Sequence, residues 1–234
     1  MLGLIIMAAG LQLRGADLPP PVVEAADRLQ DGTSYSWSTK TELIGAPVDS
    51  TTVYGKSGTN GFALLEIRRE KVSYLVFKLG NQGMVKTASG WKAEAELAGL
   101  SGTALNTALI LLKSESPTEE FSHLLKEVSG LKSEPDGSYS GQLPVGTVLR
   151  LFNSVPPPAG GSAKMPEVRN PNGTLRIWLQ NGFLHKYVLE LNGNISLSFF
   201  SHEVQRVSTV EIKDVGTTQF EIPSEAKAKL SNER

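Results

Sequence analysis

The residues of this sequence that could act as acids, bases or metal ligands are three histidines and a few carboxylates. His123, His185 and His202 do not stand at metal-ligand spacing with one another or with Asp and Glu. His123 falls on a predicted helix beside acidic residues, which favours a surface position. His185 shares one face of a predicted strand with Tyr187, which favours a core or cavity-edge histidine over a catalytic base. We therefore predict no catalytic residue, no metal site and no cofactor.

Other short motifs with chemical meaning fail on spacing or context. Gly55-Lys56-Ser57 ends like a phosphate-binding loop, but Ser50 stands where that loop needs its first glycine. The nucleophile elbow of hydrolases needs a central serine, and Gly137 to Gly141 has Tyr139 there. Glu94 and Glu96 alternate with alanine, which is typical of a solvated edge or loop. An enzyme with dispersed catalytic residues stays as a minor alternative.

Composition narrows the class of protein further. The 234 residues include 23 basic and 24 acidic side chains, without a basic stripe of the kind that nucleic-acid binders carry. The sequence has no cysteine, which excludes disulfides, thiolate zinc sites and cysteine nucleophiles. No long polar linker divides the chain, so we expect one domain over residues 17–234.

The N-terminus is predicted to be a signal peptide covering residues 1–16. Leu2 to Leu13 is almost entirely apolar, which is too short for a membrane span and suits the apolar region of a signal peptide. Two features weaken this interpretation: no Lys or Arg precedes the apolar run, and Arg14 lies close to the small residues Gly15-Ala16. The alternative is an ordinary buried N-terminal helix.

Hydrophobic periodicity predicts the elements of the chain up to its middle. Alternation of period two predicts strands over residues 35–43, 51–57, 62–69, 72–79 and 84–87, with Asn60-Gly61 as a turn. Apolar residues that recur three and four positions apart predict helices over 22–29, 104–112, 116–130 and 145–152. Ser116, Pro117 and Glu119 have the order of a capped helix start. Residues 153–170, rich in Pro and Gly, are predicted to be a long surface loop, either a connector or a flap.

The C-terminal third contains three Asn-Gly pairs, which are Asn172-Gly173, Asn181-Gly182 and Asn192-Gly193. Because Asn-Gly between alternating segments is a strong hairpin signal, we predict a meander of strands over 174–180, 183–191 and 195–200. A last strand over 207–215 and a tail helix over 224–230 follow. Blocks of strands separated by a block of helices predict an α+β fold with about eight to ten antiparallel strands in one strongly curved sheet.

Several segments resemble the C-terminal half of the LolA-like superfamily. They are Gly173 to Leu179, Leu184 to Leu189, Val210 to Gly216 and the closing segment Phe220 to Ala226. This superfamily includes the periplasmic lipoprotein carrier and the mycobacterial lipid-binding lipoproteins, and the resemblance covers roughly Pro21 to Leu230. The chain departs from the lipid-binding lipoproteins because it lacks a cysteine.

The resemblance implies a half-barrel of antiparallel strands whose concave face is covered by helices, with an apolar cavity between them for acyl chains. The residues expected to line that cavity are Tyr35, Trp37, Leu64, Tyr74, Val76, Ile177, Leu179, Tyr187 and Leu189. The function it implies is that of a periplasmic or secreted carrier of lipid or of a lipidated protein, which is compatible with a membrane-associated delivery partner. The alternative is a protein-binding or sensor module of the same fold with a filled core.

Overall fold

The computed structural model of this chain describes residues 18–30, 33–45, 50–69, 72–80, 82–97, 103–153, 167–197 and 200–232. The predicted signal peptide, residues 1–16, lies outside the described residues and stays a prediction. Within them, no helix is both long enough and apolar enough to cross a lipid bilayer.

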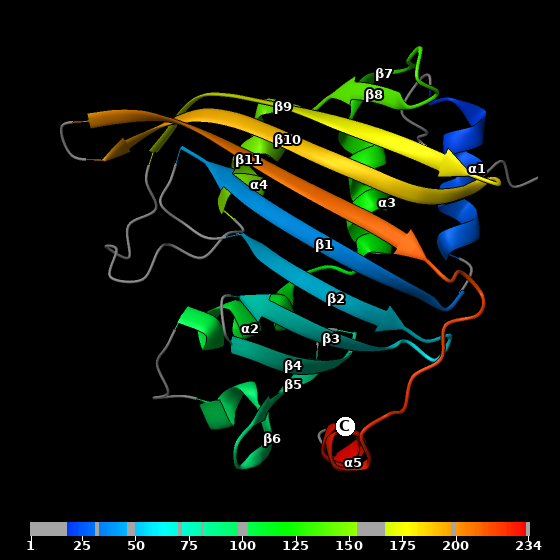
Figure 1. Ribbon diagram of the computed structural model, residues 1–234, viewed down its shortest axis with the longest axis vertical. Helices are drawn as coiled ribbons and strands as arrows, with labels where there is room; N and C mark the ends of the chain where they lie inside the picture. Colours follow the sequence, from blue (N-terminus) through cyan, green and yellow to red (C-terminus); the bar gives the residue numbers. More distant parts are fainter. Residues whose placement is uncertain are drawn as a thin grey trace, which may run out of the picture.

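Eleven strands form one sheet in the order β6-β5-β4-β3-β2-β1-β11-β10-β9-β8-β7 (Figure 1). The first six strands are β1 (Tyr35–Ile44), β2 (Thr51–Ser57), β3 (Phe62–Arg69), β4 (Val72–Leu79), β5 (Gln82–Thr87) and β6 (Gly90–Ala93). The other five are β7 (Ser129–Ser133), β8 (Tyr139–Gln142), β9 (Glu167–Gln180), β10 (Phe183–Leu197) and β11 (Phe200–Lys213). The helices are α1 (Pro20–Gln30), η1 (Glu94–Leu97), α2 (Thr103–Lys113), α3 (Pro117–Glu127), α4 (Val145–Asn153) and α5 (Ser224–Asn232).

Every neighbouring pair of strands is antiparallel, and the two halves of the chain meet where β1 pairs with β11. In that pair Trp37 is opposite Ile212 and Thr39 is opposite Val210. The sheet stays open, with β6 and β7 at its two edges. The predicted α+β class and antiparallel half-barrel are therefore confirmed, with eleven strands instead of eight to ten.

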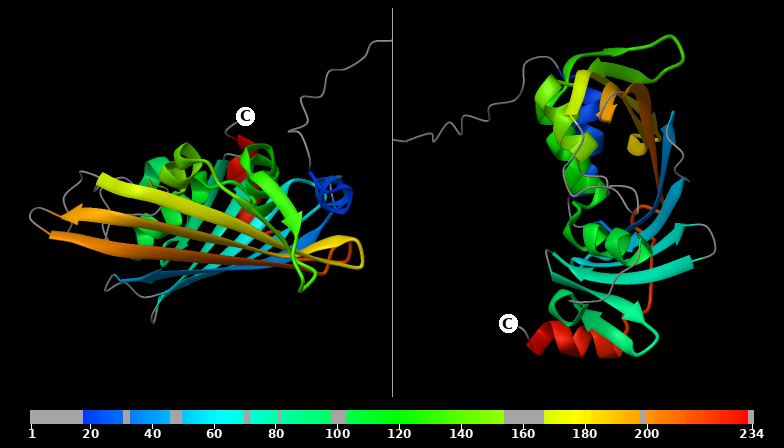
Figure 2. Two further views of the ribbon diagram at one scale, coloured as in Figure 1. Left: turned by 90° about the horizontal axis from the view of Figure 1, so that it is seen from above. Right: turned by 90° about the vertical axis from the view of Figure 1, so that its left-hand side faces the viewer.

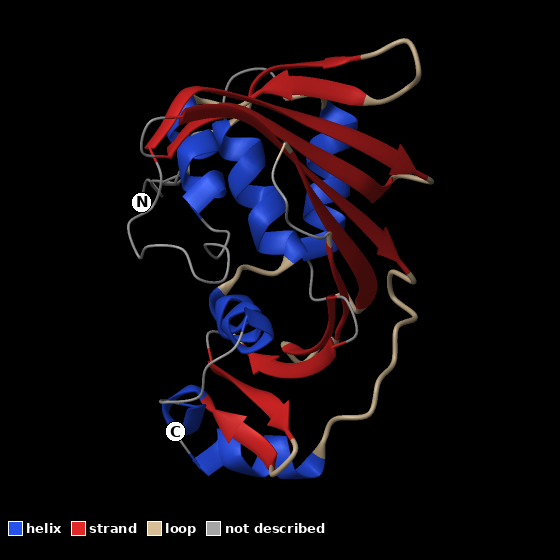
Figure 3. Cartoon of the chain, turned by 60° about the vertical axis from the view of Figure 1, so that its left-hand side comes forward, coloured by secondary structure: helices blue, strands red, loops and turns tan. Residues whose placement is uncertain are grey.

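The sheet curves around helices α1 to α4, which lie on one of its faces (Figures 2 and 3). The helices bury the stripes that their spacing predicts, such as Val22 and Leu29 on α1 and Phe121 and Leu124 on α3. At the start of α3, the Ser116 side chain and the Glu119 side chain complete the predicted capping box. These side chains and the inward residues of the strands form one continuous main core.

A second, smaller core lies on the opposite face of β4 to β6, beneath α5. Phe77, Met84 and Trp91 of the strands pack there with Ala226 and Leu230 of α5. Val76 and Phe77 are consecutive residues of β4, so the first enters the main core and the second enters the small core. The predicted tail helix thus covers the face of these strands opposite the one on which α2 packs.

Two of the three predicted Asn-Gly turns are wrong. Only Asn181-Gly182 forms a hairpin turn, with φ of 53° and 76°, between β9 and β10. Asn172-Gly173 and Asn192-Gly193 lie inside these long strands, and the Asn192 amide donates a hydrogen bond to the Asn172 side-chain oxygen at 3.3 Å. The predicted surface loop over 153–170 is also shortened, because β9 already begins at Glu167 and α4 ends at Asn153; residues 154–166 lie outside the described residues.

Gly173 and Gly193 are needed for close packing instead of for a turn. A Cβ at Gly173 would lie 2.9 Å from side-chain carbons of both Leu191 and Val148, and one at Gly193 would lie 2.6 Å from Val168. Glycine inside a strand often marks such a close approach. Because α4 packs on β9, Gly173 lets Val148 of the helix approach the sheet, and Gly193 leaves room for Val168 of β9.

Gly55 on β2 has the same role beneath Trp37 of β1. A Cβ at Gly55 would lie 2.1 Å from Cζ2 of the Trp37 ring. We predict that Gly55→Ala lowers the free energy of unfolding by about 1–3 kcal/mol, because the indole must leave its position. Urea unfolding followed by tryptophan fluorescence measures this loss.

Gly146→Ala is the matched control, because nothing lies within 4 Å of a Cβ at that position on α4. Alanine in a helix should leave stability unchanged or raise it by about 0.5–1 kcal/mol. Equal unfolding midpoints for Gly55→Ala and the unmodified protein would contradict the packing described here.

Candidate ligand-binding groove

A groove of about 610 Å³ opens between the sheet and the helices, where the ends of β1 to β4 meet α1 and the start of α3. Its volume lies within the range of about 300–1,000 Å³ that small-molecule sites occupy. It is lined by Leu29, Gln30, Thr33, Tyr35, Trp37, Ser57, Gly58, Thr59, Gly61, Ala63, Leu65, Lys78, Leu79, Gly80, Ser114, Glu115, Ser116, Thr118 and Glu119.

The groove has an apolar floor and a hydroxyl-rich rim. Trp37, Ala63 and Leu65 belong to the strands, face the helices and form the floor. The rim carries hydroxyl groups from the end of β2 and the turn after it, and from the start of α3 and the segment before it. These residues are Ser57, Thr59, Ser114, Ser116 and Thr118. This division suits a ligand with an apolar part and a polar end.

Tyr35 and Trp37 are placed by the alternation of β1. Both side chains point to the helix side, are at most 6 % exposed, and have ring centroids 5.4 Å apart. The Tyr35 hydroxyl accepts a hydrogen bond of 2.6 Å from Thr118 Oγ1, which ties β1 to the first turn of α3. Burial raises the pKa of Tyr35, although this hydrogen bond and others oppose the shift.

Lys78 on β4 brings the one ammonium group among the lining residues. Its side chain is 9 % exposed, and its Nζ donates to the carbonyl oxygens of Leu111 at 3.2 Å and Ser114 at 2.6 Å. These carbonyls lie in the last turn of α2 and just beyond it, where cations are favoured. Burial lowers the pKa of Lys78, and the negative charge of Glu119 partly opposes that shift.

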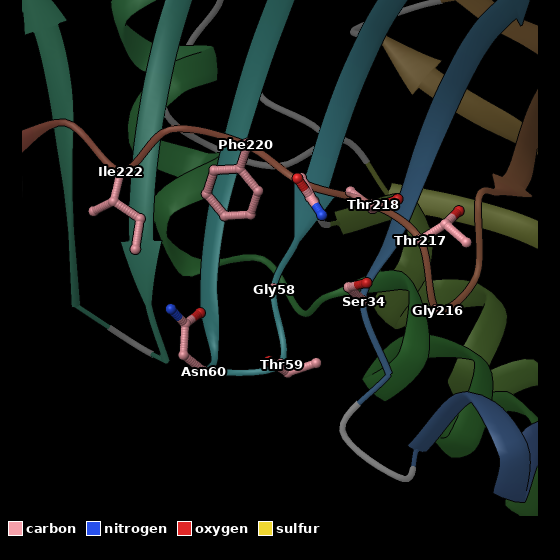
Figure 4. A pocket seen from close by; sticks show the side chains of 10 residues that line it. Ser34, Gly58, Thr59, Asn60, Gly216, Thr217, Thr218, Phe220 and Ile222 are labelled. Atoms are coloured by element: carbon pink, nitrogen blue, oxygen red, sulfur yellow. The ribbon is translucent and has the colours of Figure 1, made fainter.

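A second pocket, of about 410 Å³, adjoins the groove across the turn at Gly58 and Thr59 (Figure 4). The segment after β11 forms its other wall with Gly216, Thr217 and Thr218. The Gly216 amide donates to the Ser34 carbonyl at 2.7 Å and holds that segment against the sheet. No lining residue of this pocket carries a charge, so the larger groove is the stronger candidate site.

The structure separates the nine residues that the sequence predicts as cavity lining. Tyr35 and Trp37 line the groove. Tyr74 and Leu179 are partly buried against the main core. Four others are enclosed in that core with exposures of at most 3 %: Val76, Ile177, Tyr187 and Leu189.

Leu64 lies on the wrong face of the sheet for a cavity residue. It is opposite Phe77 and packs against the small core beneath α5, whereas its neighbour Leu65 faces the groove. Because Phe62 to Ile67 is apolar at five of six positions, alternation in this strand does not distinguish its two faces. The sequence prediction therefore missed Leu65 and Ala63.

The rim residues were missed for a different reason. Ser116 is explained by its role as the N-cap of α3, and nothing in the sequence indicates that Thr118 contacts β1. Lys78 did carry a signal, because it interrupts the apolar strand Val72 to Leu79 at a position that shares a face with Tyr74 and Val76.

The main core also contains a polar network beneath α3. The Tyr187 hydroxyl donates to Glu120 Oε2 at 2.5 Å, and Arg206 lies close enough to attract the same carboxylate. Arg206 donates to the Leu151 carbonyl of α4 and, at 3.2 Å, to Ser208 Oγ. This network links α3 and α4 to β10 and β11, so hydrogen bonds as well as apolar contacts stabilise this part of the main core.

Burial shifts the pKa values of this network. It raises the pKa of Glu120, although the hydrogen bond from Tyr187 and the positive Arg206 oppose that shift. Burial and the negative Glu120 together raise the pKa of Tyr187. Within the described ranges, no group of three or more His, Cys, Asp or Glu side chains could hold a metal ion.

Three comparisons with known proteins bear on the fold. No protein-family model matches the sequence, and no curated protein matches it. Among solved structures, the chain is similar to LprF from Mycobacterium bovis, with 14 % identity over 88 % of this chain and 95 % of that one, and a TM-score of 0.44.

Two further structures show a similar likeness. A LolA superfamily protein from Nitrosomonas europaea has 12 % identity over 87 % of this chain and 94 % of its own, with a TM-score of 0.33. A DUF1329 family protein from Desulfovibrio piger has 11 % identity over 86 % and 92 %, with a TM-score of 0.30. The LolA-like superfamily named from the sequence is thus represented among these structures. At such identities and TM-scores the likeness concerns the fold, and nothing about ligand or activity follows from it.

The raised pKa of Glu120 predicts a pH dependence of stability. The folded protein holds the Glu120 proton more tightly than the unfolded chain does, so the free energy of unfolding falls as pH rises from the ordinary carboxyl pKa to the raised one. Glu120→Gln keeps an acceptor for Tyr187 and removes this proton. We expect urea midpoints of Glu120→Gln to decline less steeply between pH 4 and 7 than those of the unmodified protein.

Glu190→Gln, at an exposed position on β10, is the control and should leave the slope unchanged. The measurement compares slopes because the loss of a charge near Arg206 also changes the absolute stability of Glu120→Gln. Identical slopes in Glu120→Gln and the unmodified protein would show that Glu120 takes up no extra proton on folding.

Proposed function

We propose that this protein is an exported, non-catalytic binding protein that holds one acyl chain of an amphiphile in the groove between β1 to β4, α1 and the start of α3. The observation that carries the proposal is the combination of an apolar floor, at Trp37, Ala63 and Leu65, with a hydroxyl-rich rim. An amphiphile meets both surfaces at once. The apolar tail lies on the floor and the head reaches the rim.

Hydrophobic transfer supplies enough free energy for such binding. Burial of each CH₂ group contributes about 0.8 kcal/mol, so a chain of about a dozen carbons needs few polar contacts to bind. The ligand class is therefore set by the shape of the groove and by its polarity at each end.

The filled main core limits the ligand to a small one. Tyr187, Phe121 and Leu124 occupy the space beneath α3 with exposures of at most 1 %. A lipid with several acyl chains would have to displace these side chains. One chain in the groove requires no such rearrangement.

The same filled core favours a second candidate function, which is a protein-binding or sensor module of this fold. In such a module the groove is a surface depression and the partner is a protein. The two functions differ in whether the isolated protein takes up a soluble amphiphile.

The proposal includes export to the periplasm or the exterior of the cell. It rests on the apolar segment Leu2 to Leu13 and on the resemblance of the sequence to exported lipid-binding proteins. A lipid ligand in an aqueous compartment must be collected and delivered, so a membrane or a membrane-associated protein is the expected partner.

Filling the groove tests the proposal. Ala63 lies on the floor, so Ala63→Trp should occupy the space that an acyl chain needs. We expect the unmodified protein to bind a fluorescent fatty-acid analogue that dodecan-1-ol displaces, and Ala63→Trp to bind it at least about tenfold more weakly. Fluorescence titration measures the affinity, and native mass spectrometry shows whether an acyl species accompanies the purified protein.

Ser73→Trp is the matched control, because Ser73 is exposed and shares its face of β4 with Leu75, away from the groove. It should bind the analogue as the unmodified protein does, and circular dichroism should show that both variants fold. An unmodified protein that binds no amphiphile and purifies without one would favour the protein-binding module instead.

A further inference from the structure

Lys78 is a buried cation that forms no ion pair in the part of the chain that the structure describes, and the negative charge of Glu119 compensates it only in part. Its side chain is 9 % exposed, and its only hydrogen-bond partners there are the Leu111 and Ser114 carbonyls. None of the ion pairs among those residues includes it. Buried lysines in proteins are usually paired with a carboxylate, because an isolated charge is costly to remove from water.

The two carboxylates nearest to this part of the groove are engaged elsewhere. Glu119 Oε2 accepts hydrogen bonds from the Ser116 amide at 2.8 Å and the Ser116 hydroxyl at 2.9 Å. Glu115 Oε1 is 2.9 Å from Nδ1 of His123. Both carboxylates are exposed to solvent, where water and salt screen them, whereas Lys78 is enclosed.

The structural role of Lys78 explains two of its three N–H donors but does not require its positive charge. Its two carbonyl partners hold β4 against the end of α2, and a neutral donor could make the same contacts. An ammonium group has three N–H donors, so one donor and the charge remain for a group inside the groove. Burial lowers the pKa of Lys78, as expected for an ammonium whose charge is not fully compensated.

We propose that the ligand of the groove has an anionic head group, a carboxylate or a phosphate, and that Lys78 supplies its counter-charge. This inference rests on the proposed function and adds the class of head group to it. The head would lie beside the Lys78 ammonium, with the acyl chain directed toward Trp37 and Leu65. Hydrogen bonds that join two charged groups are about twice as strong as neutral ones, so Lys78 would select anionic ligands over neutral ones.

Three probes with the same chain length separate the head groups. They are dodecanoate, dodecyl phosphate and dodecan-1-ol, and isothermal titration calorimetry at pH 7.5 and below the critical micelle concentration measures their binding. We expect at least one anion to bind the unmodified protein about tenfold or more tightly than the alcohol does. Preference for dodecanoate indicates a free fatty acid, and preference for dodecyl phosphate indicates a phospholipid-like head.

Lys78→Met should lower the affinity for the anion to about that for the alcohol. Lys113→Met is the control for net charge, because Lys113 is exposed near the same end of α2 and pairs with Glu94 outside the groove. It should keep the preference. If the three probes bind the unmodified protein equally, or Lys78→Met keeps the preference, the inference is wrong while the proposed function stands. If none of them binds, the proposed function fails too.

A measurement on the unmodified protein covers the case in which Lys78→Met does not fold. Carbon-13 NMR of the lysine Cε resonances follows the titration of Lys78 with and without saturating anion. A bound carboxylate or phosphate should raise the pKa of Lys78, because an opposite charge favours the ammonium form. An unchanged pKa in the presence of bound anion would overturn the inference.

Discussion

β1 is hydrogen-bonded to β2 on one side and to β11 on the other, and the rest of the structure depends on this pairing. It joins a meander from the first part of the chain to a meander from its last part, so that eleven strands share one curved surface. The residues of β1 that face inward, Tyr35 and Trp37, consequently lie at the centre of the sheet and at the wall of the groove.

The helices cover this surface unequally. Beneath α3 and α4 the space is filled by side chains and by the Tyr187, Glu120 and Arg206 network, whose hydrogen bonds fix the helices in position. At the ends of β1 to β4 the groove remains between the strands and the segments that lead into and out of the helices. The groove therefore lies beside a part of the interior that side chains fill.

Lys78 both joins two elements of the fold and lines the groove. Its two hydrogen bonds secure the end of α2 to β4. A polar residue in an apolar strand is tolerated where its hydrogen bonds are satisfied in this way.

The sequence by itself determined the strands over 51–57, 62–69 and 72–79, the capped start of α3 and the α+β class, because periodicity and capping are local properties. It did not determine the two glycines at 173 and 193, whose role depends on α4 and on the neighbouring strands rather than on adjacent residues. It also did not determine the groove: Tyr187 and Trp37 look alike as inward aromatics, yet one is enclosed and the other lines open space. Only the tertiary structure decides this, because the volume left between a sheet and its helices depends on where distant elements come to rest.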